Sequence, residues 1–380
     1  MTTNPTGASQ GGASINDINH MKAALNLARR GLGNVWPNPA VGCVITKDEK
    51  VVGRGWTLPG GRPPAETEAL QRAGNQANGG TAYVTLEPCN HEGQTPPCSE
   101  ALIDAGLKRV VIATQDPDKR VAGTGIARLK NAGIEVEFGI EKTEADLINR
   151  GFFSRIENAR PYITLKIATT LDGKIATQSG ESQWITGDFA RRASHKLRAT
   201  HDAVMIGSGT ALADDPTLTC RLPGISNERR TRIVLDGRLR MPLDSNLAAT
   251  SDEAPVLIFT LPGDDEKQEK IYVMKKRGIS ITLLPSDNAH LDVKKVVNEL
   301  ASRGITRLFV EGGGTLAASL MTADLVDDIA WFRAPSVIGN DGISAIEGLG
   351  LDKLTEMPTF SRKSLTQLGE DCLEILSRKR

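Results

Sequence analysis

Three side chains in the first third of the chain have the types and order needed for metal-assisted proton transfer. Glu66 stands two residues after Pro64, Cys89 follows another proline, and Cys98 comes nine residues after Cys89. Cysteine thiolates are good zinc ligands, and zinc lowers the pKa of a bound water to about 7. A nearby carboxylate can then take up and return a proton. We therefore predict that Glu66 is a catalytic proton shuttle and that Cys89 and Cys98 bind zinc.

One position departs from the complete pattern. Zinc-dependent base deaminases carry H-x-E, then P-C and a second cysteine, and the histidine position here is Pro64. Proline has no donor atom for a metal, whereas catalytic zinc normally has three protein ligands and a water. We expect Pro64 to weaken zinc binding and deamination but to be tolerated at the start of a helix. His91 is the nearest replacement ligand, although a solvated loop histidine is the alternative interpretation.

The cysteines also have a plain structural interpretation as buried thiols. For Cys89 and Cys98 the surrounding segments, LEPCNH and TPPC, favour a site. Cys43, in the apolar run PAVGCV, is expected to be a packed core thiol. The five cysteines are odd in number and scattered, which argues against a disulfide framework.

A second group of residues indicates anion binding in the last third of the chain. The segment Glu311-Gly-Gly-Gly-Thr315 follows an apolar strand and precedes a helix that begins near Leu316. Glycines allow a phosphate to approach the backbone, and a helix N-terminus offers unpaired N–H groups. A structural strand-to-helix turn is the alternative. Arg198 and Arg221 could clamp a substrate phosphate, although a lone arginine is usually a solvated surface group.

Composition limits the class of protein. The 380 residues are enough for two domains, and 46 basic residues balance 46 acidic ones. No overall field therefore attracts nucleic acid or anionic lipid, and neither is an expected partner. No run approaches the roughly 20 apolar residues of a membrane helix. Residues 1–14 resemble a disordered tail rather than a signal peptide, so we expect a cytoplasmic protein.

Two alternating series of helices and strands must position these residues. The first, residues 15–150, is expected to be an α/β layer with largely parallel strands, and the second, residues 151–380, another α/β domain. In the first series we expect a helix up to Ala28, strands at Ala40–Ile45, Tyr83–Leu86 and Val110–Ala113, and helices at Ala65–Ala73, Ser99–Ala105 and Ile126–Asn131. In the second we expect strands at Tyr162–Ala168, Ala203–Ile206, Arg232–Leu235, Val256–Thr260, Ile281–Leu284 and Leu308–Val310, and a helix at Val293–Ser302.

These segments closely resemble the bifunctional deaminase-reductases of riboflavin biosynthesis. The matching motifs include LDGKIA at 171–176, GESQWIT at 180–186, ADDPTL at 213–218 and VEGGG at 310–314. The resemblance covers the chain from Ile15 onward. It implies a cytidine-deaminase-like α/β domain followed by a dihydrofolate-reductase-like α/β domain. The implied function is deamination of 2,5-diamino-6-(5-phosphoribosylamino)pyrimidin-4(3H)-one, then NADPH reduction of its ribosyl group to a ribityl chain.

The resemblance also implies residue roles and two cofactors, Zn²⁺ and NADPH. The implied NADPH contacts are Ala168, Trp184, Thr210, Asp214, Gly313, Gly314, Thr315, Leu316, Ala317, Ala318 and Ser319. The implied substrate contacts are Ser182, Arg198, Leu218, Arg221 and Glu311, with Lys166 and Asp172 as further positioning groups. A core tryptophan at 184, a solvated lysine at 166 and a turn aspartate at 172 are the alternatives. A homodimer is expected.

Two other functions remain open at this point. In one, the chain is a reductase whose first domain is only a structural or dimer-forming platform. In the other, it is a nucleic-acid base deaminase, which the zero net charge and the large second domain disfavour.

Overall fold

The structure, a computed structural model, describes residues 14–90, 96–119, 121–226, 229–286 and 289–379. The chain divides into two compact units, which are described separately. The first comprises the residues up to Gly31 and Pro39–Asn149, and the second comprises Leu32–Asn38 and Arg150–Arg380. The expected tail lies outside the described residues except for Ser14, which caps the first helix. Within the described ranges, no helix is long and apolar enough to span a membrane.

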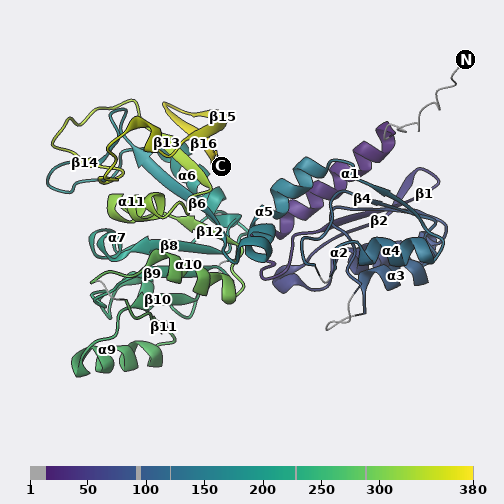
Figure 1. The fold of residues 1–380 in the computed structure, drawn as a ribbon, viewed down its shortest axis with the longest axis horizontal. Helices are drawn as coiled ribbons and strands as arrows, with labels where there is room; N and C mark the ends of the chain where they lie inside the picture. Colours follow the sequence, from purple (N-terminus) through teal and green to yellow (C-terminus); the bar gives the residue numbers. More distant parts are fainter. Residues whose placement is uncertain (1–13, 91–95, 120, 227–228, 287–288, 380) are drawn as a thin grey trace, which may run out of the picture. The chain divides into compact units, whose positions relative to one another are not determined.

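A five-stranded sheet forms the centre of the first unit (Figure 1). Its strands are β1 (Gly42–Lys47), β2 (Lys50–Trp56), β3 (Thr81–Val84), β4 (Arg109–Ile112) and β5 (Glu135–Phe138). They stand in the order β2-β1-β3-β4-β5. β1 pairs antiparallel with β2 and β3, while β3–β4 and β4–β5 are parallel. The expectation of a largely parallel sheet is therefore wrong, because β2, which was not predicted, forms a hairpin with β1.

Helices cover both faces of this sheet, with α1 and α5 on one side and α2, α3 and α4 on the other (Figure 1). The helices are α1 (Ile15–Ala28), α2 (Ala65–Ala73), α3 (Cys98–Asp104), α4 (Thr124–Asn131) and α5 (Lys142–Asn158). Glycine lets one of these helices approach the sheet closely. A Cβ atom on Gly55 of β2 would lie 2.1 Å from the carbonyl oxygen of Ala65. The first turn of α2 is therefore pressed directly against β2.

The second unit is built on a nine-stranded sheet. Its strands are β6 (Tyr162–Thr169), β8 (Ala203–Gly207), β9 (Thr231–Leu235), β10 (Val256–Thr260), β11 (Ser280–Leu283), β12 (Arg307–Val310), β13 (Asp328–Arg333), β15 (Phe360–Leu368) and β16 (Asp371–Arg378). The order is β11-β10-β9-β8-β12-β6-β13-β16-β15. The pairs from β11 to β13 are parallel, whereas β16 and β15 complete the sheet antiparallel. A separate two-stranded ribbon joins β7 (Lys174–Ala176) to β14 (Ile343–Ser344).

Apart from the edge strand β11, the parallel strands are largely buried on both faces, so their side chains alternate between two cores. Met205 of β8 and Val310 of β12 belong to one core with α10 (Val293–Ser302) and α11 (Gly314–Thr322). Val204 and Phe309 of the same strands belong to the other core with α7 (Ser208–Asp214), α8 (Asn246–Ala249) and α9 (Asp265–Lys276). Helix α6 (Asp188–Ala199) packs against β13 through Ala190. This double coverage explains the continuous apolar runs in these strands.

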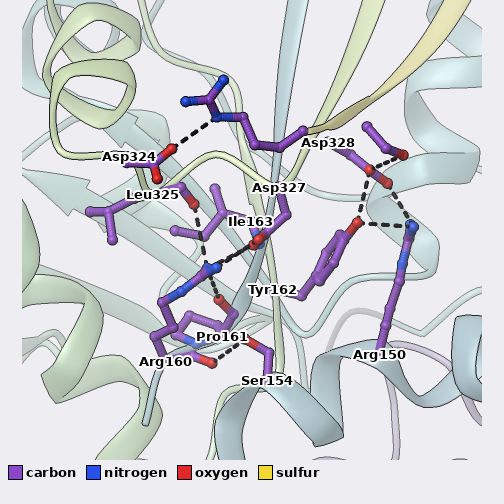
Figure 2. A network of polar contacts seen from close by, with 12 residues as sticks. Arg150, Ser154, Arg160, Pro161, Tyr162, Ile163, Asp324, Leu325, Asp327 and Asp328 are labelled. Atoms are coloured by element: carbon purple, nitrogen blue, oxygen red, sulfur yellow. Dashed lines mark hydrogen bonds and ion pairs between the residues drawn. The ribbon is translucent and has the colours of Figure 1, made fainter. Parts of the chain in front are cut away.

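A polar network joins the end of α5, from Arg150 onward, to β6 and β13 within the second unit (Figure 2). Arg160 donates two hydrogen bonds to Asp327, at 2.7 and 2.6 Å, and Asp327 also accepts the Ile163 N–H at 2.8 Å. Arg150 pairs with Asp328 at 2.7 Å. Both aspartates are buried and both are multiply hydrogen-bonded, as buried charges must be to offset their desolvation.

Candidate active sites

The predicted proton shuttle, Glu66, lies near the start of α2. It is the second helical residue, and only 4% of its surface is exposed. Burial, together with the neighbouring Cys89, raises the pKa of Glu66 to about 7. A carboxyl group with that pKa can accept and donate a proton near neutral pH.

The two predicted thiolate ligands lie next to each other. Cys98 is the first residue of α3, and its backbone N–H donates to Cys89 Sγ over 3.4 Å. The Ser99 N–H donates to the Cys89 carbonyl oxygen over 3.1 Å. A hydrogen bond with the Cys89 side chain, and then burial, raises the pKa of the Cys98 thiol well above its usual value. The structure thus brings both cysteines close to Glu66.

Glu87 supports the Cys89 segment and was not predicted from the sequence. Its carboxylate accepts backbone N–H groups from Gly123, Gly125 and Ile126, at 2.9, 3.0 and 3.2 Å. A Cβ atom on Gly125 would lie 2.0 Å from the Pro88 carbonyl oxygen. The start of α4 is therefore attached directly to the residues before Cys89. A glutamate that acts on distant backbone N–H groups has no local sequence signature.

Pro64 occupies the third ligand position of the first site but has no donor atom for a metal. It is the N-cap of α2, with φ −63°, and therefore precedes the first helical position where proline was expected. His91 lies outside the described residues. Within the described part of the chain, no three histidine, cysteine, aspartate or glutamate side chains are arranged to hold a metal ion. Two thiols beside a proline do not fit a catalytic zinc with three protein ligands.

The second unit contains a pocket of about 390 Å³. It lies where α7 and the segment after β12 follow the carboxyl ends of neighbouring parallel strands, the usual place for a ligand in an open α/β sheet. Eight of the predicted residues line it: Lys166, Trp184, Arg198, Thr210, Asp214, Leu218, Arg221 and Glu311. These residues are widely separated in sequence, and the fold brings them together.

A carboxylate and two cations form the polar part of this pocket. Arg198 on α6 donates to both oxygens of Glu311, with Nη2 3.0 Å from Oε2, and also to the Thr219 carbonyl oxygen at 2.9 Å. Lys166 Nζ of β6 lies 3.9 Å from the same Oε2 atom. Burial lowers the pKa of Lys166. Arg198 is thus held in an internal ion pair, and Arg221 is the more exposed of the two predicted phosphate-binding arginines.

The glycine segment borders this pocket rather than lining it. A Cβ atom on Gly313 would lie 3.9 Å from the hydroxyl of the pocket residue Thr210, with nothing nearer. On the adjacent strand end, a Cβ atom on Gly207 or Gly209 would meet nothing within 4 Å. Two glycine-containing turns therefore leave open backbone side by side, at the starts of α7 and α11.

Other predicted contacts lie outside the pocket lining. These are Ala168, Ser182, Gly313, Gly314, Thr315, Leu316, Ala317, Ala318 and Ser319. Leu316 and Ala317 pack into the core beneath α11, so their side chains face away from any ligand. Asp172 accepts hydrogen bonds from Thr170 Oγ1 at 2.6 Å and from the Gly339 N–H at 2.8 Å, and the Thr170 bond, followed by the Gly339 one, lowers the pKa of Asp172 to about 2. Asp172 thus has the turn role named as its alternative.

His195 lines the pocket and was missed by sequence reasoning. It lies on α6, one turn before Arg198, and its Nδ1 accepts the Arg221 N–H over 3.4 Å. Burial, and then the charges of Arg198 and Arg221, lowers the pKa of His195 to about 4. The imidazole is therefore neutral near pH 7 and carries its proton on Nε2. A histidine on an amphipathic helix gives no local sequence signal that it lines a pocket.

Comparison with known proteins gives a family to each half of the chain. Residues 14–114 match the cytidine and deoxycytidylate deaminase zinc-binding region, and residues 161–373 match the RibD C-terminal domain. The riboflavin biosynthesis protein RibD of Aquifex aeolicus is 42% identical over 95% of this chain and 98% of its own length. The Escherichia coli protein of the same name is 41% identical over 95% of this chain and its full length.

Solved structures agree with the sequence comparison. RibD of Acinetobacter baumannii is 37% identical, with a TM-score of 0.86 over 96% of this chain and 99% of that one. A diaminohydroxyphosphoribosylaminopyrimidine deaminase/5-amino-6-(5-phosphoribosylamino)uracil reductase of Thermotoga maritima is 33% identical, with a TM-score of 0.84 over the same shares. The predicted class, a zinc-deaminase α/β domain followed by a reductase α/β domain, is confirmed. The chain belongs to the RibD family, the bifunctional deaminase-reductases of riboflavin biosynthesis.

Proposed function

We propose that this chain reduces the ribosyl group of a deaminated phosphoribosylaminopyrimidine with NADPH, and that Pro64 impairs the preceding deamination. The contrast between the two sites carries the proposal. The pocket of the second unit is lined by eight of the predicted contact residues. The first site has its glutamate and two thiols but has proline at the third ligand position. The two substrates proposed here are those that appear in the names of the related proteins.

The residues around the two glycine-containing turns fit a dinucleotide. Open backbone at Gly207, Gly209 and Gly313 leaves room for phosphate groups against the starts of α7 and α11. Trp184 is 66% exposed at the pocket, where its ring can cover a flat ligand. When bound, NADPH supplies the hydride for the sugar carbon. The task of the protein is to hold substrate and cofactor together and to exclude water.

The polar groups of the pocket position the substrate. Arg221 is free to approach a phosphate from the pocket rim, and His195 can donate a hydrogen bond through Nε2. Glu311 pairs with Arg198 and lies near Lys166, so it offsets part of their positive charge. The lowered pKa of Lys166 makes its ammonium group a stronger acid, which suits it to donating a proton from Nζ to the charge that develops on the opened sugar.

The first unit then has a weakened or purely structural role. Without three protein ligands, zinc is expected to bind weakly, and no step is assigned to it. A specific observation favours the reductase-only alternative: α2 begins normally after Pro64, so the fold of the unit does not require a histidine there. In that alternative the first unit is a platform for the reductase. A homodimer remains part of the proposal, and light scattering of the purified chain measures it.

Two substrates offered to one preparation test the proposal. The chain is expected to oxidise NADPH with 5-amino-6-(5-phosphoribosylamino)uracil, and to release little ammonia from the diamino precursor. Zinc content is measured on the same sample and is expected well below one per chain. Rapid ammonia release with full zinc occupancy would contradict the second part. Failure to oxidise NADPH with the deaminated substrate would contradict the first.

A further inference from the structure

The two thiols beside Glu66 are arranged for a second kind of chemistry. The backbone N–H of Cys98 donates to Cys89 Sγ over 3.4 Å, so the Cys89 sulfur lies against the residue that carries the second thiol. The Ser99 N–H, bonded to the Cys89 carbonyl oxygen at 3.1 Å, ties the two backbone segments together. A disulfide bond is only about 2 Å long and therefore requires sulfur atoms that already lie close together. The contact between the Cys98 N–H and Cys89 Sγ brings the two residues together in the folded protein.

Zinc would normally prevent this chemistry, because bound thiolates are not available to an oxidant. Here Pro64 offers no donor, and no described trio of ligating side chains replaces the missing one. We propose that Cys89 and Cys98 are a redox-active pair that forms a reversible disulfide with a small disulfide oxidant such as oxidised glutathione. This inference rests on the proposed function, in which zinc binds weakly. It adds a site of reversible disulfide formation to the first unit.

The two cysteines differ in accessibility, which sets the order of events. Cys89 is partly exposed, whereas Cys98 is 4% exposed. The Cys89 thiolate attacks one sulfur of oxidised glutathione, the oxidant's S–S bond breaks, and one glutathione leaves as a thiolate. Cys98 passes its proton to the released glutathione thiolate, and its sulfur attacks the Cys89 sulfur and displaces the second glutathione as a thiolate. Two protein thiols lose two electrons and two protons in all, and one oxidised glutathione becomes two thiols.

Thiol counting and peptide mapping of the full chain test the proposal. The tryptic peptide 73–108 contains Cys89 and Cys98, no other cysteine, and no internal cleavage site. After incubation with oxidised glutathione, the thiols of the chain are expected to fall from five to three. Peptide 73–108 is expected to lack two hydrogen atoms and to resist alkylation until it is reduced with dithiothreitol.

Three variants make the test specific. Cys98→Ser is expected to retain a glutathione adduct on Cys89, because the second displacement cannot occur. Cys372→Ser removes a partly exposed thiol of the other unit and is expected to leave the disulfide unchanged. Pro64→His loaded with zinc is expected to keep both thiols reduced, and to form the disulfide again once a chelator removes the metal.

The zinc content of each sample separates this inference from the proposed function. Full alkylation of peptide 73–108 in a zinc-poor, oxidant-treated chain would overturn the inference and leave the proposed function intact. Separate adducts on Cys89 and Cys98, with no bond between them, would also overturn it. Stoichiometric zinc in the unmodified chain, with both thiols protected, would overturn the inference and the impaired-deaminase proposal together.

Discussion

Arg198 and Glu311 form a largely buried ion pair in the reductase pocket, with Nη2 of the arginine 3.0 Å from Oε2 of the glutamate. Lys166 Nζ lies 3.9 Å from the same oxygen, so one carboxylate is shared by two cations and offsets part of their charge. Arg198 comes from helix α6, Glu311 follows β12 and Lys166 lies in β6. The three residues therefore connect three elements at the pocket of the second unit.

Replacing the Glu311 carboxylate by an amide tests whether this ion pair supports the pocket and the fold. Glu311→Gln is expected to reduce kcat/KM for NADPH oxidation and to lower stability by about 3 kcal/mol, because it leaves buried positive charge unbalanced. Thermal melting and steady-state kinetics measure the two effects. Glu299→Gln, which removes a partly exposed ion pair with Arg303 on α10, is the control and is expected to cost about 0.5 kcal/mol. Equal effects of the two variants would contradict the assigned role.

Because the backbone at Gly313 is open, we expect a side chain added there to weaken NADPH binding without destabilising the fold. Gly313 has φ −73°, and an added Cβ atom would meet only the Thr210 hydroxyl at 3.9 Å. Gly313→Ala is therefore expected to melt like the unmodified chain but to bind NADPH about tenfold more weakly, or about 1.4 kcal/mol. Fluorescence titration with NADPH measures the affinity. An unchanged affinity would remove this turn from the cofactor site.

The network of Figure 2 provides a matched pair of stability variants. Asp327 is 4% exposed and binds Arg160 through two hydrogen bonds, whereas Asp324 is exposed and pairs with Arg378 at 2.9 Å. Asp327→Asn is expected to destabilise the chain by about 3–5 kcal/mol. Asp324→Asn is expected to cost at most about 1 kcal/mol. Denaturant unfolding measures both, and a larger loss for Asp324→Asn would be inconsistent with the burial of Asp327.

His201 predicts a pH-dependent stability. Its Nδ1 donates to the Leu197 carbonyl oxygen over 2.7 Å and its Nε2 accepts from Thr164 Oγ1 over 3.0 Å, which requires the neutral ring. Burial, and then the charge of Arg307, lowers the pKa of His201 well below its usual value. The unfolded ring titrates near pH 6.5, so its contribution is complete above about pH 6.5 and falls below it by up to about 1.4 kcal/mol per pH unit.

The variant His201→Asn removes this titration. Its melting temperature is expected to lie below that of the unmodified chain at about pH 7.5, and the gap is expected to narrow towards about pH 5.5. His290→Asn, at an exposed position, is the control. Melting curves that stay parallel over this pH range would show that His201 is not held neutral.

Some elements with a strong local pattern were predicted correctly, whereas others were missed, among them the largely buried strand β13. Helices α2 and α10 begin and end at the predicted residues. Strand β2 was missed because its turn from β1 uses Asp48 and Glu49 at positive φ rather than the usual glycine or asparagine. Strand β15 was missed because most of its side chains are exposed, so it has no apolar run.

Some of the site residues could be predicted from local sequence, and others could not. Glu66, Cys89 and Cys98 follow a compact sequence pattern, so their proximity was predictable from the residues alone. The pocket residues extend from Lys166 to Glu311, and only the resemblance to a family linked them. His195 and Glu87 were missed because each acts through backbone groups that are distant in sequence. No local spacing rule describes such contacts.

In the proposed function, Pro64 is the residue that impairs the deaminase site. The most direct measurement is zinc content and ammonia release from the diamino substrate, in the unmodified chain and in Pro64→His. We predict that the substitution raises zinc to about one per chain and raises ammonia release with it, while NADPH oxidation with the deaminated substrate stays unchanged. Equal zinc content and equal ammonia release in the two proteins would contradict the claim.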